Sequence, residues 1–467
     1  MYRSTTEYAP SLTRETAQIA LALGHEDIEQ SIREKVSLVL LDFLGCCMEA
    51  SRSEAGRKML AYKRIALAEP GLKQGDYAFH QSSGAETEAL VSGMLGHALI
   101  REDMHVPSGT HPGVVILPAM LALARREKLS GKALVRGIAA GYHVMGALGI
   151  AVRSGLTNRH FRPLGISGPF GATAGALAAT GADEETAVNA LAFAANFISG
   201  LNQWPWSGGQ EIYVQAGMAA RNALVALDLG RAGLRASPDI LEGKDGLFMA
   251  IGSDSEASTI FRAKLSAPNC LMEVTHKPVA GCNYVQTAAA AALQLRKSLG
   301  VSGTGNIRRI VVSTFSAARA YPGCDNIGPF DYLEQRKMSF QFAICTALRY
   351  GRLDGESYSA PLDSELLRLI GATEIRIDEK FELREFPAQP ARVELVMSMG
   401  EDLVYELHDV PWLNPKDVRL RFETEVAPSL SSLDLNRLVV LVSTLWDQPD
   451  TSELFALLQR AMATTDL

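Results

Sequence analysis

The sequence predicts a mainly α protein in which a large all-helical domain is interrupted by a smaller α+β lid domain. Apolar residues recur at helical spacing through most of the first half of the chain. Stretches rich in β-branched residues, which are typical of strands, are confined to the second half. Helical spacing returns after Pro415. We therefore place the helical domain at residues 1–272 plus 413–467 and the lid domain at residues 273–412.

The helices of the first half carry clear start signals and apolar faces. The segment HEDIEQSIREKVSLVLLDFLGCCMEA places apolar residues from Ile28 to Phe43 at helical spacing. Ser130 and Asp183 are candidate N-caps, and two glutamates after Asp183 suit the positive end of a helix. Residues 172–180 and 216–228 are so rich in Ala and Gly that we expect closely packed helices buried on all sides.

The lid domain combines strands with helices. NIRRIVVSTF has the β-branched content of a strand, and ARVELVMSMGEDLVYELHDV alternates about MGED, which predicts a β-hairpin. TAAAAALQLRKSLG and EQRKMSFQFAICTALRYG between them have helical spacing. From DVRLRF to the end of the chain the pattern is helical again.

Composition limits the class of protein. The chain has 467 residues, 47% of them hydrophobic and 21% charged, which is typical of soluble globular proteins with a large core. The net charge of -7 gives no reason to expect nucleic acid or an anionic membrane as a partner. We expect no apolar run to be long enough to span a bilayer, and the first residues lack the apolar core of a signal peptide. The six cysteines form no C-x-x-C pair, so we expect a reduced, cytoplasmic protein.

The stretch HALIREDMHVPSGTHPG, residues 97–113, concentrates candidate chemistry. A metal site there would use His97, Asp103, His105 and His111, but no Cys joins them and no second His lies one helical turn away. His97 lies on an apolar helical pattern, which favours a hydrogen-bonded core histidine. His111 lies on a loop just before a helix, where it is presented to a cleft as an acid/base group or is a solvated loop residue.

Two other segments carry candidate binding residues. THKPVAGCNYVQTAAAAAL places Lys277 and Cys282 before an Ala-rich helix, where a lysine and backbone N–H groups are able to hold a carboxylate. The alternative is a solvated loop lysine. NQWPWSGGQEIYVQAG clusters Trp204 and Trp206 in a Gly/Pro-rich loop, which suits an apolar pocket, a dimer contact or ordinary packing. Phosphate-binding, dinucleotide-binding, serine-hydrolase and H-E-x-x-H motifs are absent.

In succession, these stretches resemble the MmgE/PrpD family over nearly the whole chain. GHALIREDMHVPSGTHPGVVILPAMLALA is similar to the family's HALDFDDTH, HPG and PAALALAE blocks, and KPVAGCNYVQTAAAAAL is similar to its KPYPCC block. FRPLGISGPFGATAGALAATG, QAGMAARNALVALDLGRAG, ILEGKDGLF and QRKMSFQFAICTALRYG resemble further blocks. The resemblance implies a helical domain with a lid, a homodimer, a site between the domains and no cofactor. It also implies acid/base chemistry next to carboxylates: dehydration, decarboxylation or epimerisation.

The family's polar residues are retained unevenly in this chain. The resemblance implies that His111, Lys277 and Asp103 keep the family's loop histidine, lid lysine and last motif aspartate. Five family positions that carry polar or charged side chains hold other residues here, and these are Ile100, Met104, Arg162, Ile212 and Gln286. His160 is displaced by two positions from the histidine that Arg162 replaces. The candidate pocket therefore has fewer ionisable groups and more apolar surface.

The candidate site residues follow from both arguments. The candidate catalytic residues are His111 as acid/base, Lys277 as carboxylate or oxyanion anchor, Arg162 as a fixed cation, and Asp103 as the group that orients His105 or His111. The candidate substrate-binding residues are Ile100, Met104, His160, Trp204, Trp206, Ile212, Cys282, Gln286 and Tyr321. No metal ligand is expected.

Three functions fit this sequence. The first is a cofactor-independent lyase, isomerase or cyclase with a diverged site, acting on a substrate less acidic than methylcitrate, in specialised metabolism. The second is an ordinary dehydratase or decarboxylase of 2-methylcitrate or cis-aconitate type. The third is a catalytically silent binding or assembly protein. In each case the expected partners are a small molecule and a second copy of the chain, with no nucleic acid and no membrane.

Overall fold

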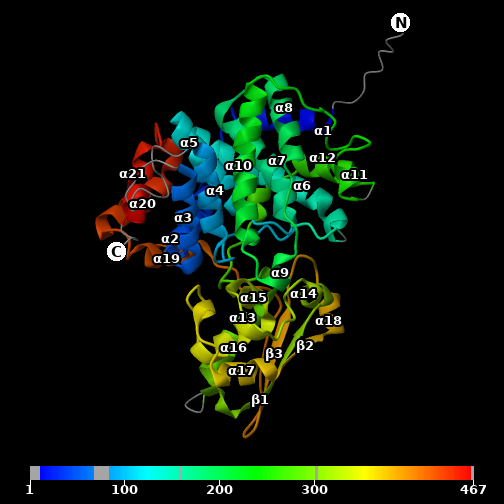
Figure 1. Ribbon diagram of the computed structural model, residues 1–467, viewed down its shortest axis with the longest axis vertical. Helices are drawn as coiled ribbons and strands as arrows, with labels where there is room; N and C mark the ends of the chain where they lie inside the picture. Colours follow the sequence, from blue (N-terminus) through cyan, green and yellow to red (C-terminus); the bar gives the residue numbers. More distant parts are fainter. Residues whose placement is uncertain (1–10, 68–83, 158, 254, 300–302, 464–467) are drawn as a thin grey trace.

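The computed structural model describes residues 11–67, 84–157, 159–253, 255–299 and 303–463, and it is mainly α-helical with a smaller α+β part. In Figure 1 the helices from the first half of the chain and the C-terminal helices form one body, and the sheet with its helices forms a second body below it. The helices of the first body are α1 (Leu12–Leu23), α2 (Gln30–Ser51), α3 (Glu54–Leu67), α4 (Ala85–His97), α5 (Gly113–Glu127), α6 (Gly131–Thr157), α7 (Pro163–Thr180), α8 (Glu184–Asn196), α9 (Trp204–Ser207), α10 (Glu211–Arg231), α11 (Leu247–Ala250), α12 (Ala257–Leu265), α19 (Pro415–Val426), α20 (Ser432–Ser443) and α21 (Ser452–Ala463), with the 3-10 turns η1 (Cys270–Glu273) and η5 (Leu445–Asp447).

The second body is a four-stranded sheet covered by helices. Its helices are α13 (Gln286–Ser298), α14 (Ser316–Ala320), α15 (Leu333–Met338), α16 (Phe340–Tyr350), α17 (Ser364–Gly371) and α18 (Glu379–Glu382), with η2 (Asn283–Val285), η3 (Gly303–Asn306) and η4 (Ser357–Ser359). Its strands are β1 (Ile307–Thr314), β2 (Thr373–Ile377), β3 (Ala391–Met397) and β4 (Leu403–Leu407), in the order β2-β1-β3-β4.

The sheet is mixed. β1 pairs parallel with β2 and antiparallel with β3, and β3 pairs antiparallel with β4. Ile310 lies opposite Thr373 on one side and Leu395 on the other. The predicted first strand and the predicted hairpin are both present. β2 was not expected from the sequence, because its five residues start two positions after the end of α17 and pair with the distant strand β1.

Helix α7 packs at the centre of the helical body, between α6 and α10. Its residues from Leu164 to Ala179 are all buried, as the Ala/Gly content predicts. A Cβ atom on Gly171 would lie 2.4 Å from Cβ of Met145, and one on Gly175 would lie 2.5 Å from the carbonyl oxygen of Gly137. The small residues therefore set the close approach of α6 and α7.

Helix α6 corrects one expectation from the sequence. Between Gly131 and Leu156 it is long and apolar enough to cross a membrane by length and composition, and it is the one such helix among the described residues. In the fold, 89% of its most apolar window is buried inside the protein. It therefore packs as a core helix.

Helix ends explain how two segments are placed. Ser130 accepts a hydrogen bond from the backbone N–H of Ala133 at 3.2 Å, and Asp183 accepts one from Thr186 at 2.9 Å, as predicted. The segment 334–351, expected as one helical stretch, is broken at Ser339 into α15 and α16. The Ser339 hydroxyl caps α16 by accepting from the N–H of Phe342 at 3.0 Å. This break leaves Lys337 at the end of α15, where it faces the helical body.

Candidate active site

The loop between α4 and α5 carries most of the candidate residues. It is tied to the segment that leads into the lid, because Met104 and Thr275 exchange two backbone hydrogen bonds of 2.8 Å each. Its turn is closed where the N–H of His105 donates to the carbonyl oxygen of Thr110 at 3.0 Å. Ile100 has a φ of 52°, which a β-branched residue rarely adopts. The loop backbone is thus held in one conformation from both sides.

Glu102 joins two histidines at the centre of the site. Its Oε1 accepts a hydrogen bond from Nδ1 of His97 at 2.6 Å and lies 3.3 Å from Nδ1 of His111. Burial raises the pKa of Glu102, but the charges of His97, Lys277 and His111 and the His97 hydrogen bond lower that pKa overall, to about 2. Glu102 is therefore ionised at neutral pH.

His111 is positioned as a neutral imidazole. Its Nδ1 lies 3.0 Å from the carbonyl oxygen of Asp103, which only accepts, so Nδ1 carries the proton and Nε2 carries the lone pair. Burial, followed by the positive charge of Lys277, lowers the pKa of His111 well below its usual value. The side chain of His111 is 12% exposed, whereas that of Glu102 is 1% exposed. His111 therefore lies at the more open edge of the cluster.

Arg162 is a buried cation locked by three acceptors. It donates to the carbonyl oxygen of Ile212 at 2.9 Å, to Oε1 of Gln215 at 3.1 Å and to Nε2 of His97 at 2.8 Å. Because Arg162 only donates, His97 must accept at Nε2 and donate from Nδ1 to Glu102. Burial lowers the pKa of Arg162, but a guanidinium keeps its charge in proteins.

Two lysines complete the positive side of the site. Lys277 is fully buried and donates from Nζ to the carbonyl oxygens of Ile100 at 2.7 Å and Gly281 at 3.4 Å. It is therefore not a solvated loop lysine. Lys337 donates to the carbonyl oxygen of Ala98 at 2.7 Å and to the hydroxyl of Tyr213 at 2.9 Å. Burial lowers the pKa of Lys277, and it lowers the pKa of Lys337 to about 8.

Asp103 does not orient a histidine through its carboxylate, which corrects the role expected for it. Its Oδ2 accepts from the hydroxyl of Tyr142 at 2.6 Å and its Oδ1 accepts from the N–H of Gly113 at 3.0 Å. Burial raises the pKa of Asp103 to about 7. Asp103 fixes the start of α5, and it reaches His111 only through its backbone carbonyl. The carboxylate next to His111 is Glu102.

His105 lies in a separate group with Cys270 and Glu273. Its Nε2 is 3.1 Å from Glu273 and its Nδ1 is 2.7 Å from the hydroxyl of Ser108. The ligand atoms of His105, Cys270 and Glu273 lie within 4.8 Å of one another, so this is the group among the described residues that could hold a metal ion. Burial raises the pKa of the Cys270 thiol to about 12, which opposes the thiolate form that metals bind. The absence of a metal site stays a prediction.

The residues described above form one cluster, which consists of His97, Glu102, His111, Arg162, Lys277 and Lys337. Several candidate substrate-binding residues lie around this cluster and support its side chains. Ile100 and Ile212 are buried and contribute carbonyl oxygens to Lys277 and Arg162. Gln286 holds the turn before α13, since its Oε1 accepts from the N–H of Val279 at 3.2 Å. The guanidinium of Arg162 lies 5.6 Å from the ring centre of Trp204.

The other candidates divide into two groups. Cys282 and Tyr321 are close enough to Arg162 to influence its pKa, and Met104 is buried in the loop. His160 and Trp206 are exposed and make no hydrogen bond or ring contact with the cluster among the described residues, so the structure does not bring them to it.

Three residues of the cluster were not among the candidate site residues. His97 was expected as a hydrogen-bonded core histidine, and it is buried and hydrogen-bonded, but to Glu102 and Arg162. Glu102 directly precedes Asp103, which carried the family match. Lys337 lies in QRKMSFQFAICTALRYG, one of the stretches that resemble the family, and that resemblance was the signal available for it.

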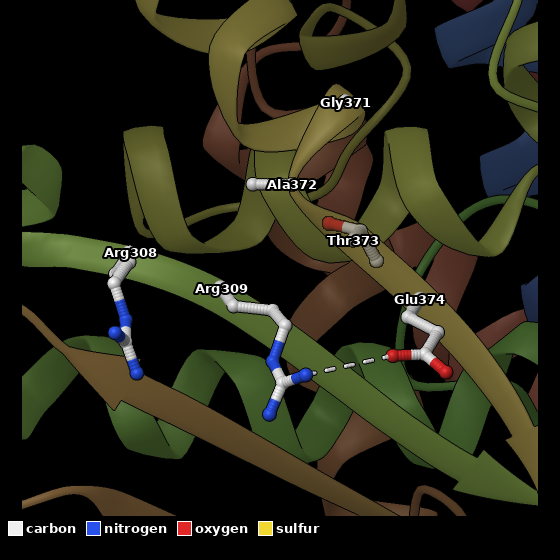
Figure 2. Close-up of a pocket in the computed structure, with 6 residues that line it drawn as sticks. All are labelled: Arg308, Arg309, Gly371, Ala372, Thr373 and Glu374. Atoms are coloured by element: carbon white, nitrogen blue, oxygen red, sulfur yellow. Dashed lines mark ion pairs between the residues drawn. The ribbon is translucent and has the colours of Figure 1, made fainter.

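A surface pocket of about 500 Å³ lies away from this cluster, on the lid sheet. Figure 2 shows its lining residues Arg308, Arg309, Gly371, Ala372, Thr373 and Glu374, which come from β1, from β2 and from the end of α17 that leads into β2. Arg309 and Glu374 are 4.0 Å apart and both half exposed. None of the candidate site residues lines it.

Comparison with known proteins supplies the family. A profile of the MmgE/PrpD N-terminal domain matches residues 14–260, and a profile of the MmgE/PrpD C-terminal domain matches residues 280–417. The chain is 27% identical over 247 residues to a cis-aconitate decarboxylase from Aspergillus terreus, which covers 51% of this chain and 49% of the relative. It is 25% identical over 337 residues to the cis-aconitate decarboxylase-like protein oryM from Aspergillus oryzae, which covers 67% of this chain and 68% of that protein. The match thus spans about half the length of the Aspergillus terreus relative. Because the two profiles together match most of its length, the chain belongs to the MmgE/PrpD family.

Proposed function

We propose that this protein is a cofactor-independent acid/base enzyme, of lyase or isomerase type, that moves a proton at a carbon next to a carboxylate of a small organic acid. The observation that carries the proposal is the geometry of His111. Its Nδ1 proton is engaged by the carbonyl of Asp103, so its lone pair is at Nε2, and buried cations lie nearby. A neutral imidazole at neutral pH is suited to remove a proton from carbon.

The cations supply the second requirement of this chemistry. Removing a proton next to a carboxylate builds negative charge on the carboxylate oxygens, and fixed positive groups stabilise that charge. Lys277 and Arg162 are both buried and are held by backbone carbonyl oxygens. Their positions are therefore set before a substrate binds, so little reorganisation is needed during the reaction.

The charges also support a substrate less acidic than a tricarboxylate. Lys277, Lys337 and Arg162 face Glu102, whose pKa of about 2 keeps it negative. Glu334, which accepts from Tyr213 at 2.9 Å, adds a second carboxylate beside Lys337. Three cations and two carboxylates leave one positive charge, which suits a substrate with fewer carboxylates than a tricarboxylate, because each further carboxylate would be buried without a partner. Apolar Ile100 and Ile212 favour a less polar remainder of the substrate.

A second candidate is decarboxylation of cis-aconitate itself. The names of the Aspergillus relatives support it, since two of them are cis-aconitate decarboxylases. In that case other groups of the same cluster, such as His97 and Lys337, take over the work of the polar side chains that this chain lacks at the replaced family positions.

We further propose that the protein acts in the cytoplasm as a homodimer, without metal or organic cofactor, and in specialised metabolism. Support comes from its six unpaired cysteines, all buried, which suit a reducing compartment. The family membership supports the dimer and the cofactor-free reaction.

The proposal is tested by proton exchange in D₂O, which detects carbanion chemistry whatever the product. Mono-, di- and tricarboxylic acids, including cis-aconitate and 2-methylcitrate, are incubated with the enzyme and followed by proton NMR. We expect loss of a C–H signal or product formation with a mono- or dicarboxylate. His111→Gln should lower this rate at least about 100-fold. The exposed His408→Gln should leave it unchanged.

The other outcomes separate the alternatives. Robust turnover of cis-aconitate or 2-methylcitrate by the wild-type protein supports the ordinary decarboxylase or dehydratase instead. If the protein binds one of these acids but shows neither proton exchange nor product formation with any of them, the result supports a binding protein. Equal rates in the wild type and His111→Gln would remove His111 from the proposed role.

A further inference from the structure

Two buried thiols face each other where the lid begins. The sulfur atoms of Cys282 and Cys324 are 3.7 Å apart, although the residues are 42 positions apart in the chain. Both side chains are buried, at 4% and 0% exposure. A disulfide needs the two sulfurs at about 2.05 Å, so closing this pair requires a movement of less than about 2 Å.

Backbone hydrogen bonds attach both cysteines to the short segment that joins α15 and α16. The N–H of Cys282 donates to the carbonyl oxygen of Lys337 at 2.8 Å, and the carbonyl oxygen of Cys324 accepts from Phe340 at 2.9 Å. Both cysteines are thus attached to residues that flank the break between α15 and α16. Their spacing is a fixed feature of the lid, and side-chain rotation is the main freedom left for the sulfurs.

The surroundings of Cys282 favour the reactive thiolate form. The hydrogen bond from Cys324 is the largest cause that lowers the pKa of Cys282, and backbone N–H groups at the start of the next helix and the charge of Lys277 also lower it. Burial raises the pKa of each of the other cysteines, Cys46, Cys47, Cys270, Cys324 and Cys345. Cys282 is therefore the thiol best prepared to act as a nucleophile.

We propose that Cys282 and Cys324 are a site of reversible oxidation, at which a peroxide converts the two thiols into a disulfide. The Cys282 thiolate attacks one peroxide oxygen and breaks the O–O bond, which gives a sulfenic acid at Cys282 and releases hydroxide. The hydroxide takes up the proton that Cys282 gave up when it formed the thiolate, which yields the first water molecule. The sulfur of Cys324 then attacks the Cys282 sulfur and forms the S–S bond, and the sulfenic oxygen leaves with the Cys324 proton as the second water molecule. Two thiols are oxidised, and hydrogen peroxide is reduced to two water molecules.

The pair is placed to affect the candidate active site. Gly281, directly before Cys282, accepts from Nζ of Lys277, and it has a φ of 105°. Drawing Cys282 towards Cys324 shifts this carbonyl, and a disulfide cannot carry the thiolate charge that acts on Lys277. We therefore expect oxidation to lower turnover as well. This consequence rests on the proposed function, but formation of the disulfide does not.

The test is a peptide map of the folded protein after exposure to hydrogen peroxide. The protein is unfolded in N-ethylmaleimide to cap remaining thiols, digested without reductant and analysed by mass spectrometry. We expect a linked Cys282–Cys324 peptide, which disappears after dithiothreitol, while Cys345 is capped. Oxidised surface methionines in the same sample show that the peroxide was effective. If methionines are oxidised and no linked peptide forms, the proposal is wrong.

Variants separate the two steps. Cys324→Ser should stop the reaction at the sulfenic acid, so that dimedone labels Cys282. Cys345→Ser, a matched buried thiol in the lid, should form the disulfide as the wild type does. Dimedone labelling at Cys324 in a Cys282→Ser variant, at the rate seen for Cys282, would contradict the assigned order. Thermal melting of each variant before exposure shows that the protein is folded, and turnover is measured separately.

Discussion

Among the single residues of the candidate active site, Glu102 is the carboxylate that contacts both histidines. It accepts a hydrogen bond from Nδ1 of His97, whose Nε2 accepts one from Arg162, and it lies beside His111. This chain of contacts sets which nitrogen of each histidine carries a proton. The family match pointed to Asp103, the next residue, because a sequence pattern gives positions and not the directions of side chains. Neighbouring residues on an irregular loop point to different partners, and only the fold shows which.

Glu102→Gln tests this network through acid stability. Folding lowers the pKa of Glu102 from 4.5 to about 2, so its stabilisation is present above pH 4.5 and is lost as the pH falls towards 2. At pH 7 the variant should be less stable by about 3 kcal/mol, which is typical of breaking a buried ion pair. The difference from wild type should shrink between pH 4.5 and 2. Urea unfolding at several pH values measures it.

The exposed Glu401→Gln, in the loop between β3 and β4, is the matched control and should change stability little at any pH. A Glu102→Gln deficit that stays constant from pH 7 to pH 3 would show that Glu102 contributes through packing and not through its charge.

At the scale of helices and strands, local sequence signals determined most of the fold. The caps at Ser130 and Asp183, the strand β1 and the β3–β4 hairpin were predicted because each depends on residues close in sequence. β2 and the break at Ser339 were missed because both depend on distant partners. β2 is set by pairing with β1, and the turn at Ser339 is fixed by contacts with the segment around Cys324.

The packing of α6 against α7 gives a prediction at this scale. A Cβ on Gly175 meets the carbonyl oxygen of Gly137 at 2.5 Å, and neither helix is free to move within the core. Gly175→Ala should therefore lower the free energy of unfolding by about 1–3 kcal/mol, although alanine favours helices in isolation. Thermal and urea unfolding measure the change.

Gly305→Ala is the comparison, because nothing lies within 4 Å of its added Cβ and its φ is not positive. We expect that variant to stay within about 0.5 kcal/mol of the wild type. A Gly175→Ala protein as stable as wild type would mean that the two helices separate easily, against the close packing argued here.

At the scale of the whole molecule, the candidate site depends on contact between the helical body and the lid. His97, Glu102 and Arg162 come from the first body, whereas Lys337 comes from α15 and reaches across to the carbonyl oxygen of Ala98. Resemblance supplied His111, Lys277 and Arg162 from separate stretches of sequence. It did not supply their arrangement, because the contacts that place these three side chains join residues from 8 to 177 positions apart.

Replacing Lys337 by Met should remove the contribution of the lid to the binding of a carboxylate ligand. A carboxylate that binds between the two bodies gains from the Lys337 charge, so it should protect the wild-type protein against thermal unfolding. At about 100 times its Kd, a ligand adds about 2.7 kcal/mol to the free energy of unfolding. In Lys337→Met, the same acid at the same concentration should give a much smaller shift in Tm, because removing one buried cation weakens binding to an anion.

The control variant is Lys297→Met, which replaces an exposed lysine on α13 of the same lid and should keep the full shift in Tm. Each variant is compared with its own ligand-free Tm, since loss of the Ala98 contact lowers stability by itself. An undiminished ligand shift in Lys337→Met would show that the acid binds without the lid and that Lys337 only holds the two bodies together.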